Sequence, residues 1–127
     1  MTEVVAAIIV KDGKILACRR PPHKKRGLLW EFPGGKREKG EDLVGALKRE
    51  CMEELGVEIA VGGLFAETKY VYEDLSVHLY FFKAEIMRGE IKMLEHCEMR
   101  FVQAEDLKKL DFCPADAEVV KLLSCGK

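Results

Sequence analysis

The segment from Gly34 to Val57, GGKREKGEDLVGALKRECMEELGV, constrains the fold of this 127-residue chain more than any other stretch. Apolar side chains recur in it at spacings of three and four residues, which is typical of a helix with one buried stripe. The stripe consists of Val44, Leu47, Cys51 and Leu55. Gly56 follows the last of them, and glycine commonly ends a helix at this position. The segment therefore predicts a helix from Glu41 to Leu55 that packs one face against a core.

Three glutamates on the predicted helix, Glu50, Glu53 and Glu54, lie within about a third of a turn of one another, beside the apolar stripe. Like charges at three or four residues each cost a helix roughly 0.2–0.5 kcal/mol, and only Glu53 has a basic residue, Arg49, at such a spacing. Such a cluster is either an ordinary solvated face or a site for a hard divalent cation. Because it follows a Gly-Gly turn, we interpret it as a candidate site for phosphate chemistry.

The same patterns predict the other elements. A β-branched run over Val4–Val10, the Asp12-Gly13 turn and a second apolar run predict an N-terminal β-hairpin. Residues 19–28 are basic and proline-rich without periodicity, which predicts a surface loop. Further along we expect two long strands around residues 73–74, a strand at 99–103 and helices near 104–110 and 114–123. This order predicts a single mixed α/β (α+β) domain over residues 1–127.

Composition narrows the class of protein. The chain carries 21 basic and 22 acidic residues, so its net charge gives no general attraction to nucleic acid. The first apolar run is short and has no basic leader, which argues against a signal peptide and a membrane span. The five cysteines are scattered and never spaced as Cys-x-x-Cys. We therefore expect a cytoplasmic protein with reduced thiols, a monomer or homodimer, with no membrane or nucleic acid polymer as partner.

The spacing of the charged and glycine residues in the opening segment is specific. It runs from Gly35 over five residues to Glu41, over seven to Arg49-Glu50, over two to Glu53-Glu54 and over one to Gly56. This pattern matches the Nudix box, and seven fixed positions at about 6% usage each would agree by chance on the order of once in 10⁸. The chain thus resembles the Nudix hydrolase family.

The resemblance extends beyond the box. WEFPGGK before it and CPAD near the C-terminus are similar to MutT-like members, and VVAAIIVKDGKIL is similar to the CTP pyrophosphohydrolase branch. Two positions depart from the usual aliphatic pattern, Cys51 and Met52, and a small hydrophobic cysteine can fill such a slot. The resemblance implies an α/β/α sandwich with a mixed β-sheet between helices.

The resemblance also implies a metal site. Glu50, Glu53 and Glu54 would be ligands of Mg²⁺ or Mn²⁺, together with the backbone carbonyl of Gly34. Glu95 matches a loop acid that serves as an extra ligand or general base in related enzymes, although an exposed loop glutamate without such a role is equally ordinary. Glu53 and Glu95 both remain candidates for the catalytic base. The structural residues of the motif would be Gly35, Glu41, Arg49 and Gly56, with Glu41 and Arg49 pairing to brace loop and helix.

Three residues are candidates for substrate binding. Arg20 matches a substrate-contacting arginine of MutT-like enzymes and Lys36 could contact phosphate, although both could equally be solvated basic side chains. Asp116 matches the residue that recognises the edge of the base, and the alternative is a helix cap. The aromatic residues Trp30, Phe32 and Tyr80 are expected in the core, with one of them able to stack on a base, and the histidines His23, His78 and His96 are given no role.

The implied activity is metal-dependent hydrolysis of a nucleoside triphosphate to monophosphate and pyrophosphate, as a hydrolase of phosphorus-containing anhydrides in nucleotide-pool sanitation. CTP, dCTP, 5-methyl-dCTP and 8-oxo-dGTP are the candidate substrates. The tyrosine of dinucleoside-polyphosphate hydrolases and the proline of ADP-ribose hydrolases are both missing after the box. The alternatives from other classes are a Nudix-fold module that binds nucleotides or proteins without catalysis and a structural divalent-ion domain.

Overall fold

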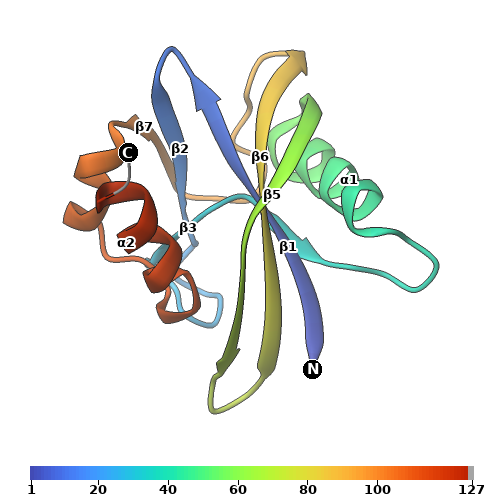
Figure 1. The fold of residues 1–127 in the computed structure, drawn as a ribbon, viewed down its shortest axis with the longest axis vertical. Helices are drawn as coiled ribbons and strands as arrows, with labels where there is room; N and C mark the ends of the chain where they lie inside the picture. Colours follow the sequence, from blue (N-terminus) through green and yellow to red (C-terminus); the bar gives the residue numbers. More distant parts are fainter. Residues whose placement is uncertain (126–127) are drawn as a thin grey trace.

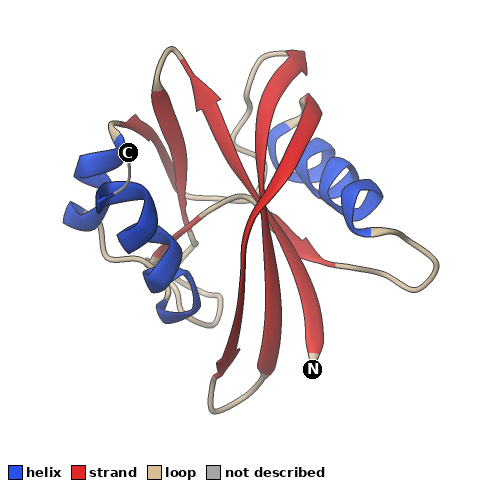
Figure 2. Ribbon diagram, in the orientation of Figure 1, coloured by secondary structure: helices blue, strands red, loops and turns tan. Residues whose placement is uncertain are grey.

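A mixed β-sheet lies between two helical layers in the computed structural model, which describes residues 1–125 (Figure 1, Figure 2). Its strands follow the path β3-β2-β1-β6-β5, with β4 pairing to β1 and β7 pairing to β2. Strands β1 and β6 are parallel, and the other pairs are antiparallel. The predicted sandwich with a mixed sheet is confirmed. The strands are β1 (Thr2–Lys11), β2 (Lys14–Arg19), β3 (Trp30–Glu31), β4 (Gly34–Lys36), β5 (Glu58–Val71), β6 (Ser76–Arg88) and β7 (Glu98–Val102).

Strand β1 is buried on both faces, which explains its continuous apolar sequence. Alternate residues of the strand point to opposite sides of the sheet. The hairpin with β2 turns at Asp12 and Gly13, both with positive φ, as the Asp-Gly signal predicts. The side chains that face helix α1 are Val5, Ala7 and Ile9, and those that face the C-terminal helices are Ala6 and Ile8.

Helix α1 (Leu43–Leu55) covers one face of the sheet. It begins two residues later than the periodicity predicts, because the Asp42 carboxylate accepts a hydrogen bond from Gly45 N at 2.6 Å and caps the helix. Gly56 ends it in the left-handed conformation with φ 69°. Of the predicted stripe, Leu47, Cys51 and Leu55 are buried and Val44 is half-buried.

The opposite face is covered by two 3₁₀ helices, η1 (Ala104–Lys109) and η2 (Pro114–Asp116), and by helix α2 (Ala117–Cys125). Both predicted C-terminal helices are present, the first entirely as 3₁₀ and the second with a 3₁₀ first turn at Pro114. Leu107, Val119 and Val120 pack this layer onto the sheet. Across residues 1–125, no helix has the length and apolarity that a membrane crossing requires. The five cysteines, which all fall within this range, are free thiols.

Two loops line the site, one between β2 and β3 and one between β6 and β7. The loop of residues 20–29 folds back on itself through bonds between Arg20 and residues 28 and 29. The loop of residues 89–97 binds the end of α1 through Leu94 N and Glu54 O at 3.2 Å, and binds β2 through Cys97 N and Arg19 O at 3.0 Å. Lys24 of the first loop pairs with Glu95 of the second at 3.1 Å, so both loops lie beside the end of α1 that carries Glu54.

Candidate functional site

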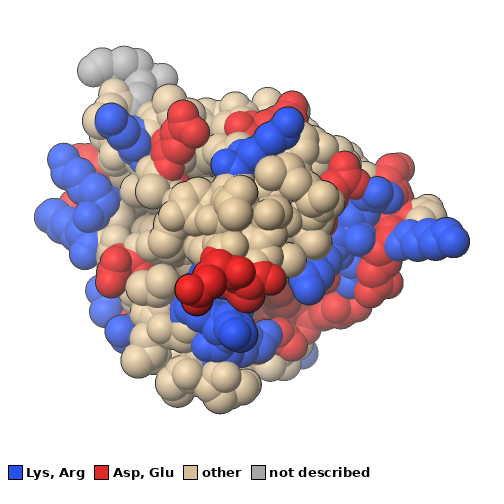
Figure 3. All heavy atoms as spheres, turned by 90° about the horizontal axis from the view of Figure 1, so that it is seen from below, with Lys and Arg blue, Asp and Glu red and all other residues tan. Residues whose placement is uncertain are grey.

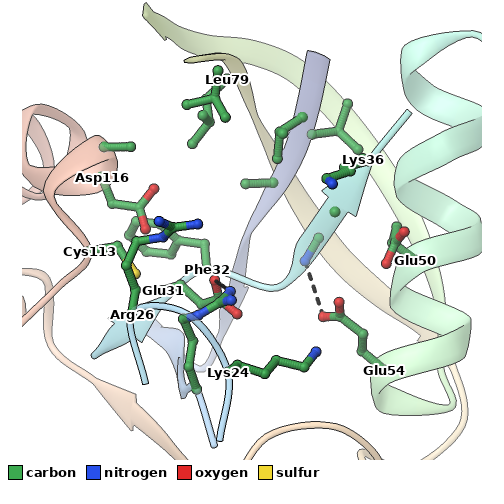
Figure 4. Close-up of a pocket in the computed structure, with 18 of the residues that line it drawn as sticks. Lys24, Arg26, Glu31, Phe32, Lys36, Glu50, Glu54, Leu79, Cys113 and Asp116 are labelled. Carbon is green, nitrogen blue, oxygen red and sulfur yellow. Dashed lines mark hydrogen bonds and ion pairs between the residues drawn. The ribbon is translucent and has the colours of Figure 1, made fainter. Parts of the chain in front are cut away.

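A cavity of about 310 Å³ opens between α1, the sheet and the C-terminal helical layer. It is lined by residues from β1, β3 and β4, from α1, from both loops and from the segment 113–116. Figure 4 shows Glu50 and Glu54 of α1 at one end and Asp116 at the other, with Glu31 between them. The acidic helix and the predicted base-recognition residue thus share one cavity.

Gly34 and Gly35, which lie at the start of β4 and not in a turn, allow α1 to approach the sheet closely. Gly34 has φ 152°, and a Cβ there would overlap the Val5 carbonyl oxygen. A Cβ on Gly35 would lie 2.5–2.6 Å from the carboxylate of Glu50. With no side chain in the way, Gly34 N–H donates to Glu54 Oε1 at 3.2 Å. The backbone contact requires glycine at position 34, and a side chain at position 35 would displace the Glu50 carboxylate.

Glu54 is a buried carboxylate in an acidic environment. Its residue is only 8% exposed, and burial together with the charges of Glu31 and Glu50 raises its pKa far above the usual range. The Gly34 N–H opposes this shift only in part. Within residues 1–125, no three acidic, histidine or cysteine side chains are already gathered around a metal position. The carboxylate oxygens of Glu50 and Glu54 nevertheless suit Mg²⁺ or Mn²⁺, whose charge would offset their repulsion.

Glu53 lies outside the cavity. Its side chain is 57% exposed and pairs with Arg49 Nη1 at 3.2 Å, since the two residues are one helical turn apart. The structure therefore brings together Glu50, Glu54 and Gly34 but not Glu53, and the ligand role of Glu53 stays a prediction.

Arg49 connects the motif. Its Nε and Nη2 bind the two carboxylate oxygens of Glu41 at 2.6 and 3.0 Å, and its Nη1 lies 3.1 Å from Glu50 Oε2. Nη2 also donates to Lys36 O at 3.0 Å, which ties α1 to the end of β4. These bonds lower the pKa of the Glu41 carboxyl, with the Arg49 hydrogen bonds as the main cause. The pair expected between Glu41 and Arg49 is present.

Arg49→Ala is expected to lower the melting temperature by roughly 5 °C, because it leaves Glu41, Glu50 and Glu53 without their shared partner. Thermal unfolding followed by circular dichroism measures the change. Arg88→Ala is the control, since Arg88 is 76% exposed and pairs only at the surface with Glu58. Equal melting temperatures for the two variants would contradict a bracing role for Arg49.

The predicted phosphate contacts and the loop acid all line the cavity. Arg20 is already engaged, since its Nη1 lies 2.9 Å from Glu31 Oε1. Lys36 follows the glycines on β4. Glu95 stands at the rim, where its carboxylate pairs with Lys24 Nζ at 3.1 Å and is 45% exposed. The base and ligand roles of Glu95 stay open.

Two cavity residues, Glu31 and His96, have no role in the sequence-based prediction. Glu31 accepts from Arg20 and lies 2.9 Å from His96 Nε2, which is itself 4.0 Å from Glu54 Oε1. The His96 side chain is 3% exposed, and its Nδ1 has no hydrogen-bond partner among residues 1–125. The position of Glu31 could have been predicted from the sequence, because side chains alternate along an extended segment. Trp30 and Phe32 are buried on one face of the sheet, so Glu31 between them must point to the opposite face. No such pattern predicts the position of His96.

Asp116 closes the other end of the cavity. The residue is 4% exposed, and burial followed by the charge of Glu31 raises the pKa of its carboxyl well above the usual value. In the described part of the chain, no backbone N–H of helix α2 donates to this carboxyl, which weighs against the helix-cap alternative. The carboxyl is thus free to bind a ligand group inside the cavity.

Comparison with known proteins agrees with this geometry. The model of the NUDIX domain family matches residues 4–122. The chain belongs to the Nudix family. This Nudix chain is 37% identical over 121 residues to the CTP pyrophosphohydrolase of Escherichia coli K12, a match that covers 95% of the chain and 90% of the relative. It is 34% identical over 119 residues to an 8-oxo-dGTP diphosphatase of Buchnera aphidicola, covering 94% and 90%.

Solved Nudix structures share the fold. The solution structure of the E. coli ORF135 protein superposes with a TM-score of 0.83 at 36% identity, over 95% of this chain and 86% of that one. The crystal structure of a MutT protein from Methanosarcina mazei superposes with a TM-score of 0.87 at 22% identity, over 98% and 93%, which supports the fold alone. The family and the fold predicted from the sequence are both confirmed.

Proposed function

We propose that this Nudix protein is a nucleoside triphosphate pyrophosphohydrolase that releases a monophosphate and pyrophosphate with the help of Mg²⁺ or Mn²⁺. One observation carries the proposal above the others. A single cavity holds carboxylates suited to a divalent cation at one end and the buried carboxyl of Asp116 at the other. A nucleotide fits this arrangement, because its polyphosphate would lie at the end with the carboxylates and the cation and its base at the end with Asp116.

Different residues of the cavity would bind the cation, bind the phosphate groups and accept the proton of the attacking water. Glu50, Glu54 and the Gly34 carbonyl would hold the cation, with Glu53 joining from the same helix. A cation bound there neutralises phosphate charge and lowers the pKa of an attacking water. Arg20 and Lys36 line the same cavity and would bind phosphate oxygens. Either Glu53 or Glu95 would take the proton of the water.

The substrate is proposed to be CTP, dCTP or a modified nucleotide such as 5-methyl-dCTP or 8-oxo-dGTP, in cytoplasmic nucleotide-pool sanitation. The activities for which the two relatives are named, CTP pyrophosphohydrolase and 8-oxo-dGTP diphosphatase, support this class. A small nucleotide also suits the surface better than a nucleic acid polymer does. Figure 3 shows basic and acidic side chains interspersed on the face that it draws, without a continuous basic surface there.

The test is release of pyrophosphate from CTP, dCTP, 5-methyl-dCTP, dGTP, 8-oxo-dGTP, ADP-ribose and diadenosine tetraphosphate, with Mg²⁺, Mn²⁺ or EDTA. We expect metal-dependent conversion of triphosphates to monophosphates, and no turnover of ADP-ribose or the dinucleotide. Nucleotide binding without turnover under any condition would instead make the chain a binding module, and turnover in EDTA would remove the metal from the proposal.

A further inference from the structure

Arg26 is a cavity residue that the proposed chemistry does not use. It lies in the loop of residues 20–29, and its side chain is 20% exposed. Its backbone has φ 57°, a left-handed conformation that is uncommon for a residue with a side chain. The loop thus keeps an unfavourable backbone angle at the residue whose side chain enters the cavity (Figure 4).

Two contacts hold the Arg26 guanidinium in place. Its Cζ lies 4.1 Å from the centroid of the Tyr72 ring, and its Nη1 donates to Asp74 Oδ1 at 3.0 Å. Tyr72 and Asp74 lie at the turn between β5 and β6, so these contacts join the loop to that hairpin. One face of the guanidinium is therefore covered by an aromatic ring and one edge is occupied by a carboxylate.

The same tyrosine connects Arg26 with the base end of the cavity. The Tyr72 hydroxyl accepts a hydrogen bond from Ala115 N at 2.8 Å, and Ala115 directly precedes Asp116. Tyr72, Arg26, Ala115 and Asp116 all line the cavity. The guanidinium plane is thus tied, through one ring, to the segment whose carboxyl would recognise the base.

From this geometry we infer that Arg26 is a stacking platform for the nucleobase, and that the base lies on the guanidinium face opposite Tyr72 while Asp116 contacts its edge. The inference rests on the proposed function and specifies its base subsite. Planar guanidinium groups stack on aromatic faces, and bases stack on arginine planes in other nucleotide-binding proteins. Stacking of this kind tolerates different bases, because every base has a π-face.

The proposed role of Arg26 depends on its flat guanidinium group rather than on its charge. Asp74 already pairs with the guanidinium, and this hydrogen bond is the leading cause of the lowered pKa of the Asp74 carboxyl. Lys36 on β4 and Arg20, the first residue after β2, also line the cavity, and Arg20 pairs there with Glu31. Arg26 therefore acts by its flat surface, which distinguishes it from a phosphate-binding cation.

The experiment compares a ligand with a base and a ligand without one. Dissociation constants of CMP and of inorganic pyrophosphate are measured by calorimetry for wild type, Arg26→Ala, Arg26→Lys and Lys25→Ala. Lys25→Ala is the matched control, because it removes one positive charge from the same loop. Lys25 is exposed and does not line the cavity. Thermal melts verify that each variant is folded.

Arg26→Ala is expected to raise the dissociation constant of CMP about tenfold, which corresponds to the loss of one base stack. The dissociation constant of pyrophosphate should not change. Arg26→Lys should resemble Arg26→Ala, because lysine keeps the charge but not the plane, and Lys25→Ala should resemble wild type. In turnover, Arg26→Ala should raise KM for CTP and GTP alike with little change in kcat.

Several results would overturn the platform: unchanged CMP affinity in Arg26→Ala, equal weakening of CMP and pyrophosphate, or full rescue by lysine. The proposed function fails separately. A wild-type protein that binds CMP through Arg26 but hydrolyses no triphosphate would overturn the activity and keep the platform.

Discussion

Glu54→Gln is expected to reduce kcat/KM for the best triphosphate by about 10³-fold, and at the same time to raise the melting temperature of the metal-free protein. The loss follows from the position of Glu54, the most buried of the three glutamates, which accepts a hydrogen bond from Gly34 N at the start of β4. Metal assistance amounts to several kcal/mol of transition-state stabilisation, and each 1.36 kcal/mol is about tenfold in rate.

The gain in stability has a separate cause. Without a cation, the Glu54 carboxylate is buried near Glu31 and Glu50, and this environment raises its pKa because it disfavours the charged form. Glutamine has nearly the same shape, can still accept from Gly34 N–H and carries no charge. At neutral pH the metal-free wild type must either bury this charge or take up a proton that the unfolded chain does not hold, and the variant avoids both costs.

Melting curves with and without MgCl₂ separate these effects. Wild type should be stabilised by Mg²⁺, whereas Glu54→Gln should melt higher in EDTA and respond little to the ion. Glu85→Gln is the control, because Glu85 is exposed on β6 away from the cavity. If Glu54→Gln kept its activity, or gained as much stability from Mg²⁺ as wild type, Glu54 would not be part of a metal site.

Periodicity and spacing were enough to predict the frame of this site. The stripe of α1, the Asp12-Gly13 hairpin and the buried run of β1 are local patterns, and each is present in the structure. The Nudix box likewise identified the family, because its fixed spacing reflects contacts within one loop and one helix. Features that depend on neighbours in sequence were therefore accessible without coordinates.

The contacts that depend on distant segments were not accessible. Glu31 and His96 meet across 65 residues of sequence, and Lys24 meets Glu95 across 71. No periodicity or local spacing in the sequence predicts either contact. The sequence does place Arg49 one turn before Glu53, but it could not show that this pair forms and that the Glu53 carboxylate stays outside the cavity. Motif spacing places a residue on an element, and tertiary contacts decide where its side chain points.

Asp116→Asn is expected to change the ratio of kcat/KM between CTP and 8-oxo-dGTP by about tenfold, within the 1–3 kcal/mol that one base contact contributes. An ionised aspartate only accepts hydrogen bonds, a protonated one can also donate, and asparagine always offers an amide donor. Burial and the charge of Glu31 raise the Asp116 pKa, which favours the protonated form in the folded protein. The substitution therefore alters the donor and acceptor pattern that a base meets.

The same shift makes stability depend on pH with a definite sign. Because the pKa of Asp116 is higher in the folded than in the unfolded chain, its folded state holds the proton more tightly. This contribution is fully present below the unfolded pKa, near 3.9, and is lost as pH rises from there toward the folded pKa. Asp116→Asn cannot ionise, so it should melt higher than wild type at pH 8 and differ little at pH 4.

Substrate panels at fixed Mg²⁺ and melting curves from pH 4 to pH 8 test both effects in one variant. Asp106→Asn is the control, since Asp106 lies at the surface in η1 and pairs with Lys109. A changed base ratio without a pH-dependent gain in stability would mean that Asp116 is ionised in the folded protein and recognises the base as a carboxylate. A gain in stability without a changed ratio would make Asp116 a buried acid with no part in base recognition, and the base end of the cavity would then depend on the Tyr72 and Arg26 side.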